Sequence, residues 1–155
     1  SEMCIRDSAY TDAYTKGDIK WIDQTFNRAL KLWLLSVCGG IVMLFGCQYF
    51  YHIWIGNKVL VPFTVSLSTF IYVSFFNLNN CVTYLINGLN KIRIQIITSL
   101  VITATYVLTI MSMGKQLGIE GIVLCMAASY AVMSLIHLYQ CKLLIKGKAT
   151  GIWNK

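Results

Sequence analysis

The sequence predicts an all-α, polytopic helical membrane protein in which four transmembrane helices follow an amphipathic cytoplasmic helix. Three observations support this prediction. The 155 residues are 57% hydrophobic, four long stretches between Lys31 and Lys142 contain no charged side chain, and basic residues gather on one side of these stretches. A helix needs ~20 apolar residues to cross a bilayer core of ~30 Å, and a charge near its centre costs several kcal/mol. A water-soluble fold is discounted, because too little amphipathic sequence remains to cover four helices that are apolar all round.

The first eight residues, Ser1 to Ser8, form a mixed-charge tract unlike the rest of the chain. This tract looks like a translated sequencing-adapter remnant, and we exclude it from the fold prediction. The N-terminus shows no signal-peptide pattern. We therefore expect the chain to be a C-terminal fragment of a longer protein.

Residues 9–31 are predicted to form an amphipathic cytoplasmic segment. Gly17 interrupts it, and Asp18 is a suitable helix N-cap. The apolar face then comprises Ile19, Ile22, Phe26, Ala29 and Leu30, and the polar face comprises Lys20, Gln24, Asn27 and Lys31. Two interpretations stay open. This helix lies in the membrane interface before the chain turns into the bilayer, or it is a surface helix packed on other parts of the protein.

The four spans are predicted near residues 32–51, 62–87, 94–113 and 119–141. Small residues such as Gly40 in the first span and Gly121 in the last favour close helix packing. Pro62 is expected to begin the second helix. At ~1.5 Å per residue this helix is about 39 Å long, so it must tilt, kink or project beyond the bilayer.

The positive charges predict the orientation of the chain. Setting Arg6 aside, ten Lys and Arg residues lie near the two chain ends and in the loop at Lys91, against two in the opposite loops, Lys58 and Lys115. Since Lys and Arg accumulate in short cytoplasmic segments, both chain ends should be cytoplasmic, with residues 142–155 a basic tail. The net charge of +7 is interpreted as topology and attraction to anionic lipids, and no nucleic-acid partner is expected.

Amides are concentrated in the cytoplasmic half of the second predicted span. Asn77, Asn80, Tyr84 and Asn87 fall at positions i, i+3, i+7 and i+10, which places them on one face of a helix. We call these four residues the amide stripe. Either they hydrogen-bond to neighbouring helices, or they line a water-filled cavity that holds a polar substrate.

The other polar residues do not indicate an enzyme. The six cysteines lack Cys-x-x-Cys spacing, and His52 and His137 lie too far apart in the sequence to form a local metal pair. Glu120 is interpreted as a surface residue at a helix start, with proton or cation coupling as the alternative. We predict no catalytic residue, no metal site and no cofactor.

Short motifs also occur in a characteristic order over residues 9–155. They are Lys16-Gly17-Asp18, Lys31-Leu32-Trp33, Trp54-Ile55-Gly56, Asn87-Gly88 followed by Lys91-Ile92-Arg93 and Gln95, and the tail from Lys146 to Lys155. Together they resemble the C-terminal third of bacterial polysaccharide-biosynthesis flippases. Those proteins belong to the multidrug, oligosaccharidyl-lipid and polysaccharide exporter superfamily.

The resemblance implies a two-lobed transporter in the bacterial inner membrane, of which this chain supplies the last four helices. Its partners would be membrane lipids, the N-terminal helices of the same transporter and a lipid-linked oligosaccharide. Such a protein moves undecaprenyl-diphosphate-linked oligosaccharide to the outer leaflet by alternating access. In that setting the amide stripe would contact sugar hydroxyls, and Lys91 and Arg93 would attract the diphosphate. A plain topological role is the alternative for these two cations.

Other functions fit the same architecture. A drug or cation antiporter of the same superfamily would share it. A complete four-helix membrane protein that assists envelope glycan assembly and a purely structural membrane subunit are further alternatives. No Lys or Arg lies within the four predicted spans. Any Lys or Arg side chain that binds the diphosphate deep in the cavity would therefore have to come from the other lobe.

Overall fold

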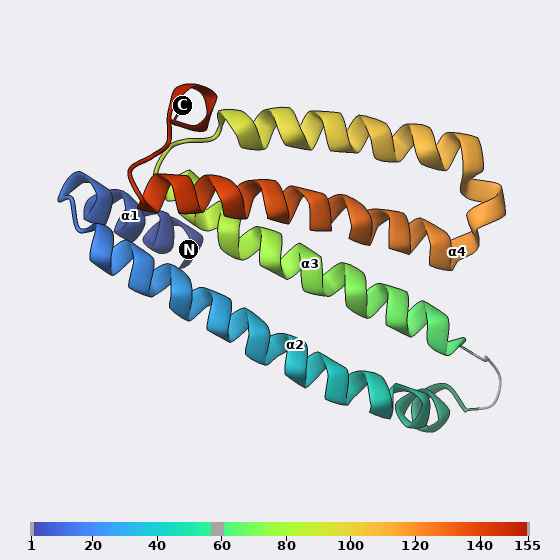
Figure 1. The fold of residues 1–155 in the computed structure, drawn as a ribbon. Helices are drawn as coiled ribbons and strands as arrows, with labels where there is room; N and C mark the ends of the chain where they lie inside the picture. The colour runs from blue at the N-terminus through green and yellow to red at the C-terminus, as the bar shows by residue number, and fades with distance from the viewer. Residues whose placement is uncertain (1, 57–60, 155) are drawn as a thin grey trace.

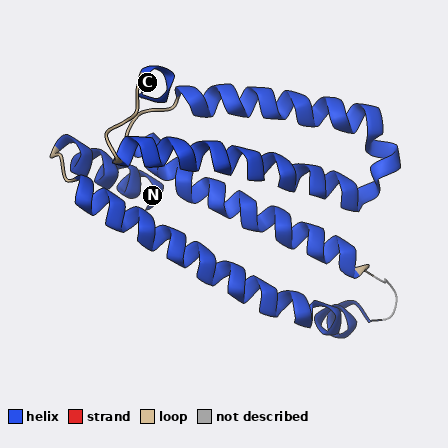
Figure 2. Cartoon of the chain, viewed as in Figure 1, coloured by secondary structure: helices blue, strands red, loops and turns tan. Residues whose placement is uncertain are grey.

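The computed structural model describes residues 2–56 and 61–154, which form helices and turns without a strand in these ranges (Figure 2). The elements are α1 (Glu2–Thr15), α2 (Ile19–Ile55), α3 (Phe63–Gly88), α4 (Arg93–Ile145) and the short 3-10 helix η2 (Gly151–Asn154). The predicted all-α class is confirmed for this part of the chain. Lys58 and its neighbours 57, 59 and 60 lie outside the described residues.

A turn at Gly17, where φ is +72°, separates α1 from α2. Asp18 caps α2 as predicted, because its carboxylate accepts a hydrogen bond of 3.0 Å from the backbone N–H of Trp21. The helix then continues for 37 residues. The predicted turn into the bilayer after the amphipathic segment is therefore wrong. No glycine or proline occurs in residues 19–38, so nothing in the sequence terminates the helix there.

The boundaries of α3 agree with the predicted second span, since the helix begins directly after Pro62. By contrast, α4 consists of two antiparallel legs (Figure 1). Gly118 divides them with φ +62° and ψ −174°, a conformation that only glycine adopts readily. We call residues 93–117 the first leg and residues 119–145 the return leg. The predicted spans 94–113 and 119–141 fall on these two legs.

The long helices lie side by side in the order α2, α3, return leg and first leg (Figure 1). The buried core is gathered at the end of this layer where α1 lies. It comprises Tyr10, Ala13, Ile22, Phe26, Leu78, Val82, Leu85, Ile86, Leu89, Cys141 and Leu144. Burial of Ile22 and Phe26 confirms the apolar face predicted for the amphipathic segment. Each such side chain contributes about 1.5–3 kcal/mol relative to exposure in water.

Apolar side chains also cover much of the outer surface. Leu35, Phe45 and Met111 are 67%, 80% and 80% exposed. In the described part of the chain, α2 and α4 are long and apolar enough to cross a membrane, and the amide-rich α3 is not. None of the most apolar stretch of α2 is buried within the structure. The outer faces of these helices therefore have no protein partner among residues 2–56 and 61–154.

Candidate functional site

A groove of about 340 Å³ lies between α2 and α3 and contains most of the amide stripe. Its lining comprises Ala29, Leu32, Trp33 and Ser36 from α2 and Asn77, Asn80, Cys81 and Tyr84 from α3. We call it the α2–α3 groove. The i, i+3, i+7 spacing predicted from the sequence brings Asn77, Asn80 and Tyr84 together on one wall. The opposite wall, on α2, supplies the indole of Trp33 and the hydroxyl of Ser36.

Two hydrogen bonds fix the α2 wall of the groove. The indole Nε1–H of Trp33 donates to the backbone carbonyl of Ser74 at 2.8 Å, which ties α2 directly to α3. The hydroxyl of Ser36 donates to the backbone carbonyl of Trp33 at 2.7 Å. An indole N–H that is shielded from water normally finds such an acceptor, and here the acceptor belongs to the neighbouring helix. Trp33 therefore links the two walls of the groove.

The two groove amides, Asn77 and Asn80, form no hydrogen bond within the described part of the chain. Asn77 is exposed and Asn80 is half-buried, and neither side chain makes a hydrogen bond with any residue that the structure describes. Asn79, which lies on another face of α3, makes a hydrogen bond that joins α3 to α4. Asn77 and Asn80 keep their full donor and acceptor capacity, and each amide offers two N–H donors and one carbonyl oxygen.

The remaining residues predicted for the site lie apart from the groove. Asn87 is exposed and does not line it. The ammonium of Lys91 donates to the backbone carbonyl of Asn154 at 3.1 Å, so it is held by the C-terminal turn. Arg93 is exposed at the first residue of α4. The structure therefore unites three of the four stripe residues and leaves both cations outside the groove.

A buried polar network, which the sequence analysis did not identify, joins α3 to both legs of α4. His137 is fully buried, with Nδ1 3.0 Å from Oδ1 of Asn79 and Nε2 3.0 Å from Oγ1 of Thr98. Two further bonds run from the return leg to α3, where Ser134 donates to the Phe75 carbonyl at 3.3 Å and Cys141 to the Val82 carbonyl at 3.7 Å. The signal in the sequence was the i, i+3, i+7 spacing of Ser134, His137 and Cys141.

Glu120 has a specific partner at the opposite end of the layer. The hydroxyl of Thr64, in the first turn of α3, donates to its carboxylate near the start of the return leg. This position agrees with the interpretation of Glu120 as a residue at a helix start. Within residues 2–56 and 61–154, no group of three or more His, Cys, Asp or Glu side chains is placed to hold a metal ion.

Comparison with protein-family models, with curated proteins and with solved structures gives no match to this chain.

Proposed function

We propose that this chain is the C-terminal part of a flippase that carries undecaprenyl-diphosphate-linked oligosaccharide across the bacterial inner membrane for surface polysaccharide biosynthesis. Two findings support the proposal. The motif order described above resembles that of such transporters, and the α2–α3 groove presents polar groups suited to a glycan. The chain would act as a transporter rather than as an enzyme.

In this proposal α2, α3 and each leg of α4 cross the bilayer once. The exposed apolar surface supports a lipid environment, because Phe45 and Met111 are each 80% exposed. In water each such side chain would forgo about 1.5–3 kcal/mol of burial energy, whereas lipid tails remove that cost. The less apolar α3 lies between α2 and the return leg (Figure 1).

The observation that carries the proposal is the pair of unpartnered amides in the α2–α3 groove. Leaving an amide without a hydrogen bond in an apolar medium costs several kcal/mol, so Asn77 and Asn80 require water or a polar ligand. Sugar hydroxyls both donate and accept hydrogen bonds, as these amides do. The rings of Trp33 and Tyr84 add flat apolar surfaces that suit the C–H faces of a pyranose. The groove therefore matches a neutral, hydroxylated substrate.

Lys91 and Arg93 supply the charge for the diphosphate in this proposal. Both lie at the end of the layer that the charge distribution predicts to be cytoplasmic. The Asn154 carbonyl holds the Lys91 ammonium in the structure. A diphosphate would compete with that single neutral acceptor, and a charge-assisted bond is roughly twice as strong as a neutral one. The headgroup would thus displace the C-terminal turn from Lys91.

Replacement of both groove amides in the chromosomal gene tests the proposed function. We expect Asn77→Leu with Asn80→Leu to lower surface polysaccharide, scored by lectin binding to intact cells, by at least about tenfold, since two hydrogen bonds to substrate are lost. Asn27→Leu is the matched control, because it removes an exposed amide on the polar face of α2 outside the groove. Normal export by the double variant, at normal protein abundance, would rule out the groove as the substrate path.

A further inference from the structure

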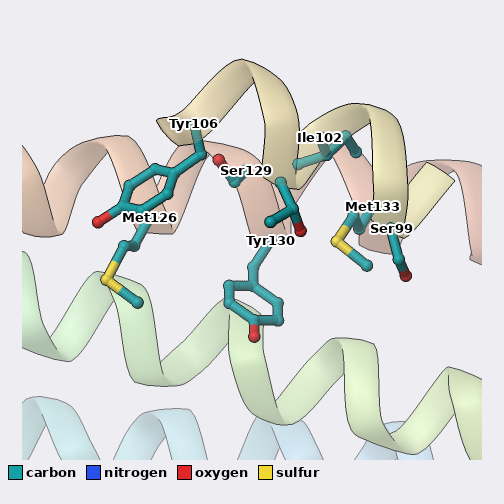
Figure 3. Close-up of a pocket in the computed structure, with 8 residues that line it drawn as sticks. Ser99, Ile102, Tyr106, Met126, Ser129, Tyr130 and Met133 are labelled. Atoms are coloured by element: carbon teal, nitrogen blue, oxygen red, sulfur yellow. The ribbon is translucent and has the colours of Figure 1, made fainter. Parts of the chain in front are cut away.

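A second cavity, of about 280 Å³, lies between the two legs of α4. Its walls comprise Ser99, Ile102, Thr103 and Tyr106 from the first leg and Met126, Ser129, Tyr130 and Met133 from the return leg (Figure 3). We call it the interleg pocket. It shares no residue with the α2–α3 groove.

The lining of the interleg pocket follows helical spacing on both legs. Ser99, Thr103 and Tyr106 fall at i, i+4 and i+7 along the first leg, which places three hydroxyls on one face. Met126, Tyr130 and Met133 repeat the same spacing on the return leg and add two thioethers and a tyrosine. Two regular faces of antiparallel helices therefore meet across the pocket, and one of them is polar.

The hydroxyls in this pocket differ from the others in the same helix. Five hydroxyls of α4 donate to a backbone carbonyl three or four residues earlier, and they belong to Thr98, Thr105, Thr109, Ser112 and Ser129. A sixth, that of Ser134, donates to the Phe75 carbonyl. Ser99 and Thr103 are the two Ser or Thr residues of α4 without a hydrogen-bond partner among the described residues. The same holds for the hydroxyls of Tyr106 and Tyr130. The hydroxyls of Ser99, Thr103 and Tyr106, all with unused capacity, therefore line one cavity, whereas the Tyr130 ring is directed toward α3.

Aromatic contacts with α3 hold one wall of the pocket in place. The Tyr130 ring packs edge-on against Tyr72, with centroids 5.7 Å apart, and against Phe76, with centroids 5.3 Å apart. Figure 3 shows the Tyr130 ring reaching from the return leg toward α3. Such edge-to-face pairs restrict the ring without using its hydroxyl. The Tyr130 side chain is therefore a fixed surface rather than a mobile one.

The chemistry of the lining identifies the class of ligand. None of the eight lining residues carries a charge, so an ionic ligand would have no counter-charge in the pocket. A hydrocarbon chain would leave the hydroxyls of Ser99, Thr103 and Tyr106 unpaired, which is unfavourable in an apolar environment. A hydroxylated ring with an apolar face satisfies both parts of the lining. The volume lies near the lower limit of ~300 Å³ for ligand pockets, so it fits one ring rather than a chain of rings.

We propose that the interleg pocket binds a single neutral sugar ring. Its role as a subsite for one residue of the transported glycan rests on the function proposed above. The binding itself rests on the three unpaired hydroxyls and the fixed Tyr130 ring. Its ligand contacts would be hydrogen bonds from Ser99, Thr103 and Tyr106 and packing on Tyr130.

Saturation-transfer NMR on the full chain tests this subsite. The chain is purified in lauryldimethylamine oxide, a detergent without a sugar headgroup, and methyl β-D-glucopyranoside and N-acetylglucosamine are the probes. We expect the ring protons of at least one probe to be saturated. Ser99→Ala with Thr103→Val should weaken that binding by at least about tenfold, because two hydrogen bonds are lost without a change of shape.

The matched control is Ser112→Ala with Thr69→Val, which removes the same atoms from hydroxyls that donate to the carbonyls of Leu108 and Val65 outside the pocket. Far-UV circular dichroism checks the fold of both doubles. Tyr106→Phe, which removes one oxygen atom, keeps the test decisive if the first double misfolds. Absence of probe saturation in the unmodified chain, or equal binding by the pocket variants, would show a cavity that holds water only. Probe binding with normal export by the groove variants would reject the proposed function alone.

Discussion

Nδ1 of His137 lies 3.0 Å from Oδ1 of Asn79, and both residues are buried. Nε2 of the same ring contacts the Thr98 hydroxyl at 3.0 Å. His137 therefore joins the return leg to α3 on one side and to the first leg on the other. This imidazole therefore connects α3 and both legs of α4 at one buried point.

Asn79→Leu is expected to destabilise the chain. The substitution leaves the His137 ring nitrogen buried without a partner, which costs about 1–3 kcal/mol. Hydrogen bonds between membrane helices average ~0.6 kcal/mol, so we expect a cost of about 0.6–3 kcal/mol. The measurement is the midpoint of thermal or dodecyl sulfate unfolding of the purified chain, followed by circular dichroism.

Asn77→Leu provides the matched comparison, because Asn77 is exposed and makes no hydrogen bond with the described residues. Its effect should remain within about 0.5 kcal/mol. A double-mutant cycle of Asn79→Leu with His137→Leu should give a coupling energy of at least about 0.5 kcal/mol. Equal destabilisation by the two asparagine variants, or additive effects in the cycle, would argue against the bond.

The close approach of α2 to α3 depends on Gly40. A Cβ atom at this position would lie 2.5 Å from Cε2 of Phe70, whereas a Cβ atom at the adjacent Gly39 would meet nothing within 4 Å. We expect Gly40→Ala to cost about 1–3 kcal/mol through overpacking. Gly39→Ala should be neutral or stabilising by up to about 1 kcal/mol, since alanine favours a helix.

The same unfolding assay distinguishes these two glycines, and Phe70→Ala supplies the third variant. If the clash with the ring is the cause, Gly40→Ala should cost less in the Phe70→Ala background than in the unmodified chain. An undiminished cost in that background would assign the effect to something other than the α2–α3 contact.

Local patterns predicted the parts of the fold that depend on neighbouring residues. The Asp18 cap and the start of α3 after Pro62 follow from rules that act over three or four residues. Helical spacing likewise placed Asn77, Asn80 and Tyr84 on one face. It also placed Asn87 on this stripe, although Asn87 lies three residues beyond Tyr84 and does not line the groove, because spacing gives a direction and not the extent of a groove.

Contacts between distant segments were beyond these rules. His137 is separated from Asn79 by 58 residues and from Thr98 by 39. The sequence shows which face each residue occupies, but not which faces meet, so Asn79 could not be distinguished from the other amides of α3. The unbroken α2 was missed because amphipathic and apolar segments were taken to require a turn between them. A helix tolerates that change of environment without a break.

Gly118→Ala is expected to weaken the pairing of the two legs of α4. With φ +62° and ψ −174°, this position lies in a region that is essentially restricted to glycine, and a side chain there costs about 1–3 kcal/mol. Gly46→Ala is the control, since Gly46 lies within α2 and an added Cβ would meet nothing within 4 Å. Thermal unfolding of both variants checks the prediction, and equal midpoints would show that the hairpin does not depend on Gly118.

The proposed four-span topology predicts opposite exposure of two lysines. Lys115, near the bend of α4, should face the outside of the cell, and Lys148, in the basic tail, should face the cytoplasm, because each leg would cross the bilayer once. Cysteines introduced by Lys115→Cys and Lys148→Cys, in a background without the natural cysteines, are tested with a membrane-impermeant maleimide on intact cells. Only the cysteine at position 115 should react before permeabilisation, and both should react afterwards. Reaction of both cysteines from the outside would place the legs of α4 outside the bilayer. Protection of both until permeabilisation would confine α4 to the cytoplasmic side, and either result would remove the lipid environment on which the flippase proposal depends.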